Sequence, residues 1–165
     1  MKYSIKLSVF ILVLVVSSNL VYAHCQVPCG IYDDHTRFVM LREHITTIEK
    51  SMTELTELSK NPSANINQLV RWVNNKDDHA DEFTEIVTYY FLTQRIKITD
   101  PKDMNDFTTY QKQLTLLHQM MVYSMKCKQT TDLQNVAKLK SLVDEFEKTY
   151  FTEDELKHIK VEHKK

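Results

Sequence analysis

The near absence of glycine is the feature that most constrains the fold of this chain. Its 165 residues include one glycine, Gly30, and three prolines. Glycine and proline are the residues that most often interrupt helices, so a chain with so few of them favours helix almost everywhere. We therefore expect an all-α fold.

Apolar spacing divides the chain into four amphipathic segments. In each segment apolar residues recur at alternating steps of three and four, which is the period of one helix face. The expected seams are Phe38, Leu41, Ile45, Ile48, Met52 and Leu55; Ile66, Leu69, Val73, Ala80, Phe83, Val87 and Tyr90; Phe107, Tyr110, Leu114, Leu117 and Met121; and Val136, Leu139, Val143, Phe146 and Tyr150. Four helices with short connections predict an antiparallel four-helix bundle over residues 34–151.

Capping residues set the expected ends of these helices. The second helix should run as one piece from about Asn65 to Gln94. The other expected starts are Asp33 or Asp34 as the first N-cap, Asp100-Pro101 for the third helix, and the capping-box pair Thr131 and Gln134 for the fourth. Thr152 and Glu155 favour a short further helix in the polar tail, residues 152–165.

The N-terminus has the pattern of a secretory signal peptide. Lys2 and Lys6 precede an apolar run from Leu7 to Val16, and Ala23 is a suitable residue before a cut. The run is shorter than the roughly 20 residues that a spanning helix needs, although an uncleaved membrane anchor is the alternative. We expect residues 1–23 to be removed and the mature protein, beginning at His24, to be secreted or periplasmic.

The charge balance argues against nucleic acid as a partner. The chain has 21 Lys and Arg against 22 Asp and Glu, and two of the lysines lie in the leader. A nucleic-acid-binding domain would show a basic stripe, and none is present. We also expect no membrane contact once the leader is cleaved.

Residues 24–33 carry the unusual chemistry of this sequence, and we call them the hook. Cleavage after Ala23 would give His24 a free α-amine beside its imidazole and the amide that it shares with Cys25. Cys25 and Cys29 add two thiolates. Nitrogen and thiolate donors of this kind suit Ni(II) or copper, whereas a closed zinc site requires four side-chain ligands. The predicted metal ligands are therefore His24, Cys25 and Cys29.

Other residues with metal-binding side chains do not form a recognisable pattern. A di-iron bundle needs two Glu-x-x-His units, and only Glu155-x-x-His158 is present, on the polar tail. The c-type haem motif is absent. The histidines off the seams or in the tail show no ligand spacing and are expected at the surface or in hydrogen bonds: His35, His44, His79, His118 and His163. Cys127 is expected to be a lone thiol.

The hook resembles the N-terminal segment of the nickel-containing superoxide dismutases, His-Cys-x-x-Pro-Cys-Gly-x-Tyr followed by an acidic residue. The matching residues are His24, Cys25, Pro28, Cys29, Gly30, Tyr32 and Asp33. Seven matching positions within ten are far more specific than a lone Cys-x-x-x-Cys. The resemblance continues over the rest of the mature chain as a four-helix bundle.

This resemblance implies an enzyme that converts superoxide to dioxygen and hydrogen peroxide through a Ni(II)/Ni(III) cycle. By the same resemblance, the His24 amine, the Cys25 amide and both thiolates form a square plane, and the His24 imidazole is an axial ligand of the oxidised ion. Tyr32 would line the access route and orient small anions or water. Family members assemble as hexamers, and some apolar residues outside a single seam would suit a homo-oligomer, such as Met40, Trp72, Ile86 and Tyr89.

The chain also departs from the family pattern. Gln26 replaces an acidic residue frequently found after the first cysteine. By ungapped counting, Met40 falls where the family has a glutamate that holds the axial imidazole, and Glu43 lies about one turn further on. By the same counting, an arginine of the family falls among residues 74–76, which here are Asn, Asn and Lys.

Three alternatives to the enzyme remain open at this point. In the first, the hook binds nickel or copper without turnover, as a periplasmic metal carrier. In the second, Cys25 and Cys29 form a simple disulfide in an oxidising compartment, and the bundle is a binding module. A redox-active cysteine pair is the third alternative, although three residues separate the cysteines and no thioredoxin-like βαβ pattern surrounds them.

Overall fold

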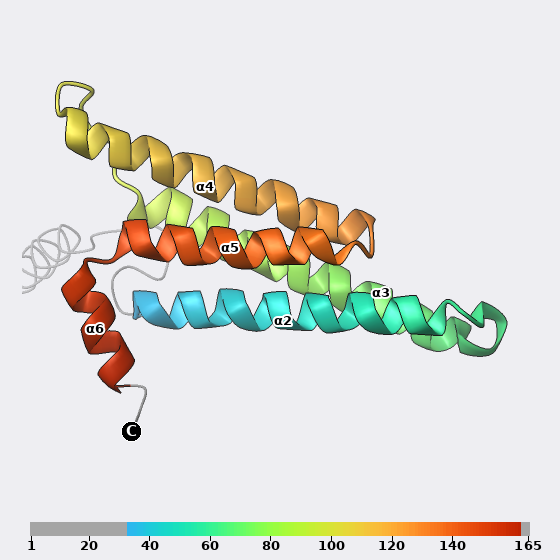
Figure 1. The fold of residues 1–165 in the computed structure, drawn as a ribbon. Helices are drawn as coiled ribbons and strands as arrows, with labels where there is room; N and C mark the ends of the chain where they lie inside the picture. Colours follow the sequence, from blue (N-terminus) through green and yellow to red (C-terminus); the bar gives the residue numbers. More distant parts are fainter. Residues whose placement is uncertain (1–32, 163–165) are drawn as a thin grey trace, which may run out of the picture. The chain divides into compact units, whose positions relative to one another are not determined.

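The computed structural model describes residues 33–162, and within them it is helical with no strand. The elements are α2 (Asp34–Leu58), α3 (Pro62–Glu85), η2 (Ile86–Arg95), α4 (Met104–Gln129), α5 (Leu133–Tyr150) and α6 (Glu153–Glu162). Helix α2 packs on α3 and α5, and α4 packs on the same two neighbours, so the four long helices form a bundle (Figure 1). The predicted all-α bundle is confirmed. None of the described helices is long and apolar enough to cross a membrane.

Polar caps explain where the helices begin. Asp33 caps α2 by accepting a 2.9 Å hydrogen bond from the backbone N–H of His35, as predicted. Pro62 occupies the first turn of α3, three residues before the predicted start. The caps of α4 and α5 are Asp103 and Asp132, so the predicted starts at Asp100-Pro101 and at the Thr131 capping box are wrong. Each aspartate lies directly before its helix and accepts a hydrogen bond from a backbone N–H of the first turn.

The predicted short helix in the tail is present as α6. The backbone N–H of Thr152 donates to the Glu155 carboxylate at 2.7 Å, and the Thr152 hydroxyl accepts from the Glu155 N–H at 3.4 Å. This reciprocal pair is a capping box. Because the Glu155 side chain is committed to the cap, the Glu155-x-x-His158 pattern is explained without a metal.

The second long helix is not a single α-helix as predicted. From Ile86 it continues as the π-helix η2, in which each hydrogen bond spans five residues rather than four. Ile86, Val87, Tyr90 and Phe91 of this segment are buried in the core. Such segments are rare and often lie at functional sites.

An aromatic cluster fills the core at the end of the bundle where α2 begins. The Phe38 ring lies 4.9 Å from Phe91, 5.6 Å from Phe146 and from Tyr150, and 5.4 Å from Phe151, measured between ring centroids. Buried aromatic pairs at these distances add roughly 0.5–1.5 kcal/mol each beyond the area that they bury. The first turns of α2 are thereby fixed against η2 and α5.

The predicted seams are correct for the first and fourth helices and only partly correct for the others. Ile66 and Val73 are 66% and 40% exposed, because the hairpin between α2 and α3 extends past the ends of α4 and α5 (Figure 1). In α4 the buried residues are Leu116, Leu117, Met120, Ser124 and Cys127. Of the apolar residues assigned to an oligomer surface, Ile86 is buried in the core, while Tyr89 is 54% exposed.

Candidate metal centre

The predicted ligands His24, Cys25 and Cys29, and the predicted access residue Tyr32, lie outside the described residues. The chain is described from Asp33 onward, which is the last residue of the hook and the N-cap of α2. The site is therefore built here from the residues that hold the start of α2.

A polar cluster around Asp34 holds this end of the bundle together. The Tyr150 hydroxyl donates to one carboxylate oxygen of Asp34 at 2.8 Å, and the Tyr90 hydroxyl donates to the other. The Nε atom of Arg95 lies 2.9 Å from Asp34 Oδ1, and an Arg95 Nη2 donates to the Tyr90 hydroxyl at 3.0 Å. Three elements, η2, α5 and the start of α2, thus meet at one carboxylate. We call Asp34, Tyr90, Arg95 and Tyr150 the Asp34 cluster.

The protonation states in the Asp34 cluster follow from burial. Burial, with the hydrogen bond to Asp34, raises the pKa of Tyr150 far above its ordinary value, and the same causes raise that of Tyr90. Both phenols are therefore neutral donors at physiological pH. The guanidinium carbons of Arg37 and Arg95 lie 5.0 and 4.9 Å from the centre of the Tyr90 ring, within cation–π range.

A second connection ties α2 to α5 about two turns further along α2. Arg42 donates to both carboxylate oxygens of Glu147, at 3.2 and 2.7 Å, and to Asp144 at 2.9 Å. A two-pronged arginine–carboxylate pair fixes orientation as well as distance. The first three turns of α2 are therefore held by polar contacts on one side and by the aromatic cluster on the other.

The departures seen by sequence counting have structural explanations in the described residues. Met40 is half-buried and packs against the core, with its sulfur 3.3 Å from Arg37 Nη1. Glu43 is exposed. Lys76 is 3% exposed, and its amine donates to the carbonyls of Cys127 and Lys128 at 2.8 and 2.5 Å. The Lys76 amine caps the C-terminus of α4, so this side chain has a structural role in the bundle.

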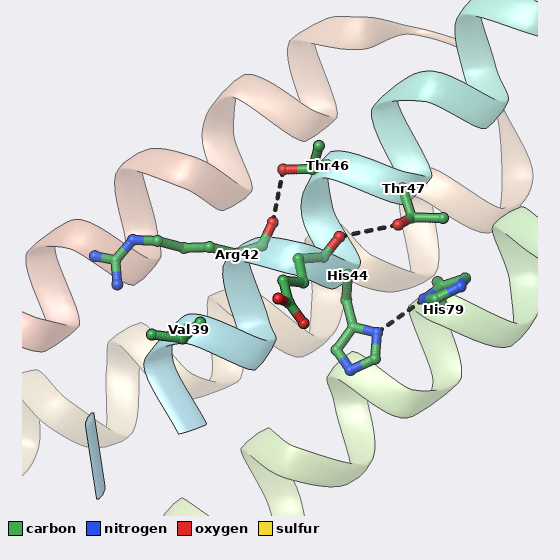
Figure 2. A pocket seen from close by; sticks show the side chains of 7 residues that line it. Val39, Arg42, His44, Thr46, Thr47 and His79 are labelled. Atoms are coloured by element: carbon green, nitrogen blue, oxygen red, sulfur yellow. Dashed lines mark hydrogen bonds between the residues drawn. The ribbon is translucent and has the colours of Figure 1, made fainter. Parts of the chain in front are cut away.

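Two histidines that sequence spacing does not connect are brought together by the packing of α2 on α3. His44 Nδ1 lies 2.9 Å from His79 Nδ1, and both atoms lie near the Glu82 carboxylate. The expectation of hydrogen-bonded histidines is confirmed for this pair, which lines an open depression of about 530 Å³ (Figure 2). Burial lowers the pKa of His44 below its ordinary value.

Cys127 is a free thiol, as predicted. It is fully buried, and desolvation raises its pKa to about 11. A neutral thiol of this kind is a poor nucleophile and a poor metal ligand.

Comparison with known proteins decides the family. A model of the nickel-containing superoxide dismutases matches residues 19–154. The chain belongs to this family. As a member of the family, it is an oxidoreductase, and its cofactor is nickel. No curated protein and no solved structure matches the chain.

The residues of this dismutase that sequence reasoning missed are those of the Asp34 cluster. Tyr90 and Tyr150 were assigned to apolar seams, which is correct for their rings and gives no information on their hydroxyls. Asp34 was considered only as a cap. A tyrosine on an apolar seam needs a polar partner for its hydroxyl. This requirement is the sequence feature that indicates a buried polar contact at Tyr90 and Tyr150.

Proposed function

We propose that this dismutase holds one nickel ion with His24, Cys25 and Cys29 and converts two superoxide anions and two protons to dioxygen and hydrogen peroxide. The observation that carries the proposal is that the family match begins at residue 19 and so includes the hook. The donor set fits the metal, since thiolate sulfur with amine and amide nitrogen is a combination that suits Ni(II). When bound, nickel supplies the one-electron exchange between its divalent and trivalent states.

The chain's own residues have separate tasks in this proposal. Cys25 and Cys29 present two thiolates, and His24 presents its α-amine and imidazole. Tyr32 orients water or a small anion beside the centre. The next two residues are Asp33 and Asp34, which cap α2 and anchor the Asp34 cluster. The chain that follows the hook is therefore anchored to the bundle at Asp34.

The free amine of His24 requires removal of residues 1–23. We infer that a signal peptidase cuts after Ala23 and that the mature enzyme is secreted or periplasmic. The precursor would be inert, because a nitrogen acylated by Ala23 is a poor donor.

An exposed apolar stripe supports the inference of a homo-oligomer. Ile66, Val70 and Val73 recur along one face of α3 and are 66%, 55% and 40% exposed. Contiguous apolar surface of this kind favours association. Mass measurement of the native mature protein tests this: a monomer would contradict it, and the hexamer known for the family would support it.

The second candidate function is a nickel or copper carrier without turnover. It is favoured by Gln26 and Met40, which stand where the family places acidic residues. Outer groups of this kind tune a metal and orient its ligands, so their loss can leave binding intact and remove activity.

The deciding experiment compares two nickel-loaded proteins, one beginning at His24 and one carrying a single extra N-terminal alanine. Superoxide consumption by the first and not by the second supports both the enzyme and the free amine. Stoichiometric nickel in the first protein without superoxide consumption supports the carrier. Equal activity in both proteins would refute the role of the His24 amine.

A further inference from the structure

We propose that His44, His79 and Glu82 form a second metal site, which takes a divalent transition ion of the zinc type and clamps α2 to α3. Nothing in the family assignment concerns these residues. They are the one group of at least three possible ligands that converges within the described part of the chain. The proposal is independent of the hook.

The three donor atoms form a triangle of the right size. His44 Nδ1 lies 2.9 Å from His79 Nδ1 and 3.3 Å from Glu82 Oε2, and His79 Nδ1 lies 3.5 Å from the same oxygen. Neighbouring ligands of a tetrahedral zinc ion are about 3.4 Å apart. An ion about 2.1 Å from all three donor atoms would lie about 1 Å out of the plane of the triangle. The three atoms would then form one face of its coordination tetrahedron.

Proton counting favours a cation at this position. The two Nδ1 atoms face each other at hydrogen-bond distance, so one proton lies between them and one nitrogen must accept it. The Glu82 oxygen, also an acceptor, is directed at the same two nitrogens. One N–H donor therefore faces two acceptors, whereas a metal ion that replaces the proton would bind the lone pairs of all three atoms.

The surroundings determine which ion fits and how it enters. Two imidazoles and a carboxylate are the ligands of zinc sites in which the remaining position is left to water. The His44 side chain is 11% exposed, while those of His79 and Glu82 are 30% and 57% exposed, so the site has a buried side and an open side. Figure 2 shows His44 on α2 and His79 on α3 pointing toward each other at the depression. The hydroxyls of Thr46 and Thr47 donate to backbone carbonyls of their own helix and are not ligands.

The role that follows is structural. His44 belongs to α2, whereas His79 and Glu82 lie one turn apart on α3. An ion that binds only when the two helices are packed stabilises the native state in proportion to its occupancy.

The test uses the full mature chain with Cys25→Ser and Cys29→Ser, so that zinc cannot be held by the hook thiolates. Calorimetric titration with zinc should show one equivalent bound. His79→Gln and Glu82→Gln should each weaken binding by at least about 100-fold. His118→Gln is the matched control, because His118 is an exposed histidine on another helix, α4, and should change nothing.

A second readout separates binding at this site from adventitious binding. Zinc at about 100 times its dissociation constant should raise the melting temperature by about 5–10 °C in the His118→Gln control and not in His79→Gln. Circular dichroism without zinc should show that all variants fold alike, since the substituted side chains are partly exposed. Absence of zinc binding, or equal binding by His79→Gln and the control, would overturn the proposal.

Discussion

Replacing Tyr150 with phenylalanine isolates one contact of the Asp34 cluster. The ring lies 5.6 Å from Phe38 and from Phe146, and phenylalanine preserves this packing while it removes the hydroxyl. The lost bond is a 2.8 Å donation to a carboxylate. Hydrogen bonds to charged groups contribute about 1.5–3 kcal/mol. Asp34 keeps Tyr90 and Arg95 as partners, so we expect a loss near 1.5–2 kcal/mol in the free energy of unfolding.

Equilibrium urea denaturation followed by far-UV circular dichroism measures this loss directly. The control is Tyr110→Phe, because the Tyr110 hydroxyl makes no hydrogen bond in the part of the chain that the structure describes and its ring lies 6.2 Å from Phe107. We expect the control to change stability by less than about 0.5 kcal/mol. Equal stability of the two variants would show that the Asp34 cluster does not hold the start of α2.

Three further predictions concern other buried groups. Lys76→Met should lower the free energy of unfolding by at least about 2 kcal/mol in urea titrations, because it leaves carbonyls at the end of α4 without their donor. The control is Lys140→Met at the surface, which should lower it by less than about 1 kcal/mol. The raised pKa values of Tyr90 and Tyr150 mean that the folded state favours neutral phenols. The stability that they contribute is therefore complete below the unfolded pKa of about 10 and is lost as the pH rises above it. The urea midpoints at pH 9 and pH 11 should differ more for the parent protein than for Tyr150→Phe. Cys127, buried and with a pKa of about 11, should resist iodoacetamide at pH 8 until urea unfolds the chain, measured by mass in a protein whose hook cysteines are replaced; rapid native labelling would contradict its burial.

The sequence predicted the fold class and most of the core for a simple physical reason. Helix periodicity depends on local spacing, so Phe38 to Leu55 and Val136 to Phe146 were placed on the correct faces. Burial of Ile66 and Val73 was predicted wrongly, because the projection of the α2–α3 hairpin beyond its neighbours depends on the relative lengths of four helices.

The polar sites differ in how far local sequence could reveal them. The hook is a contiguous motif of ten residues, so candidate ligands can be named from the sequence alone, and their assignment stays a prediction. The contact between His44 and His79 joins residues 35 positions apart on two helices. Their pairing depends on the rotation and register of α2 against α3, and no local pattern encodes that register.

The π-helix η2 couples the direction of Arg95 to the wide turn that precedes it. Each residue of an α-helix advances by about 100°, and one wide turn takes up one additional residue between the buried Ala80 and Phe83 before it and Arg95 after it. A substitution that closed this turn without shortening the chain would rotate Arg95 by about 100°, away from Asp34. Deleting one residue as the turn closes would instead leave Arg95 in its present direction. The segment should therefore tolerate loss of a residue better than a substitution that restores an ordinary α-helix of the same length.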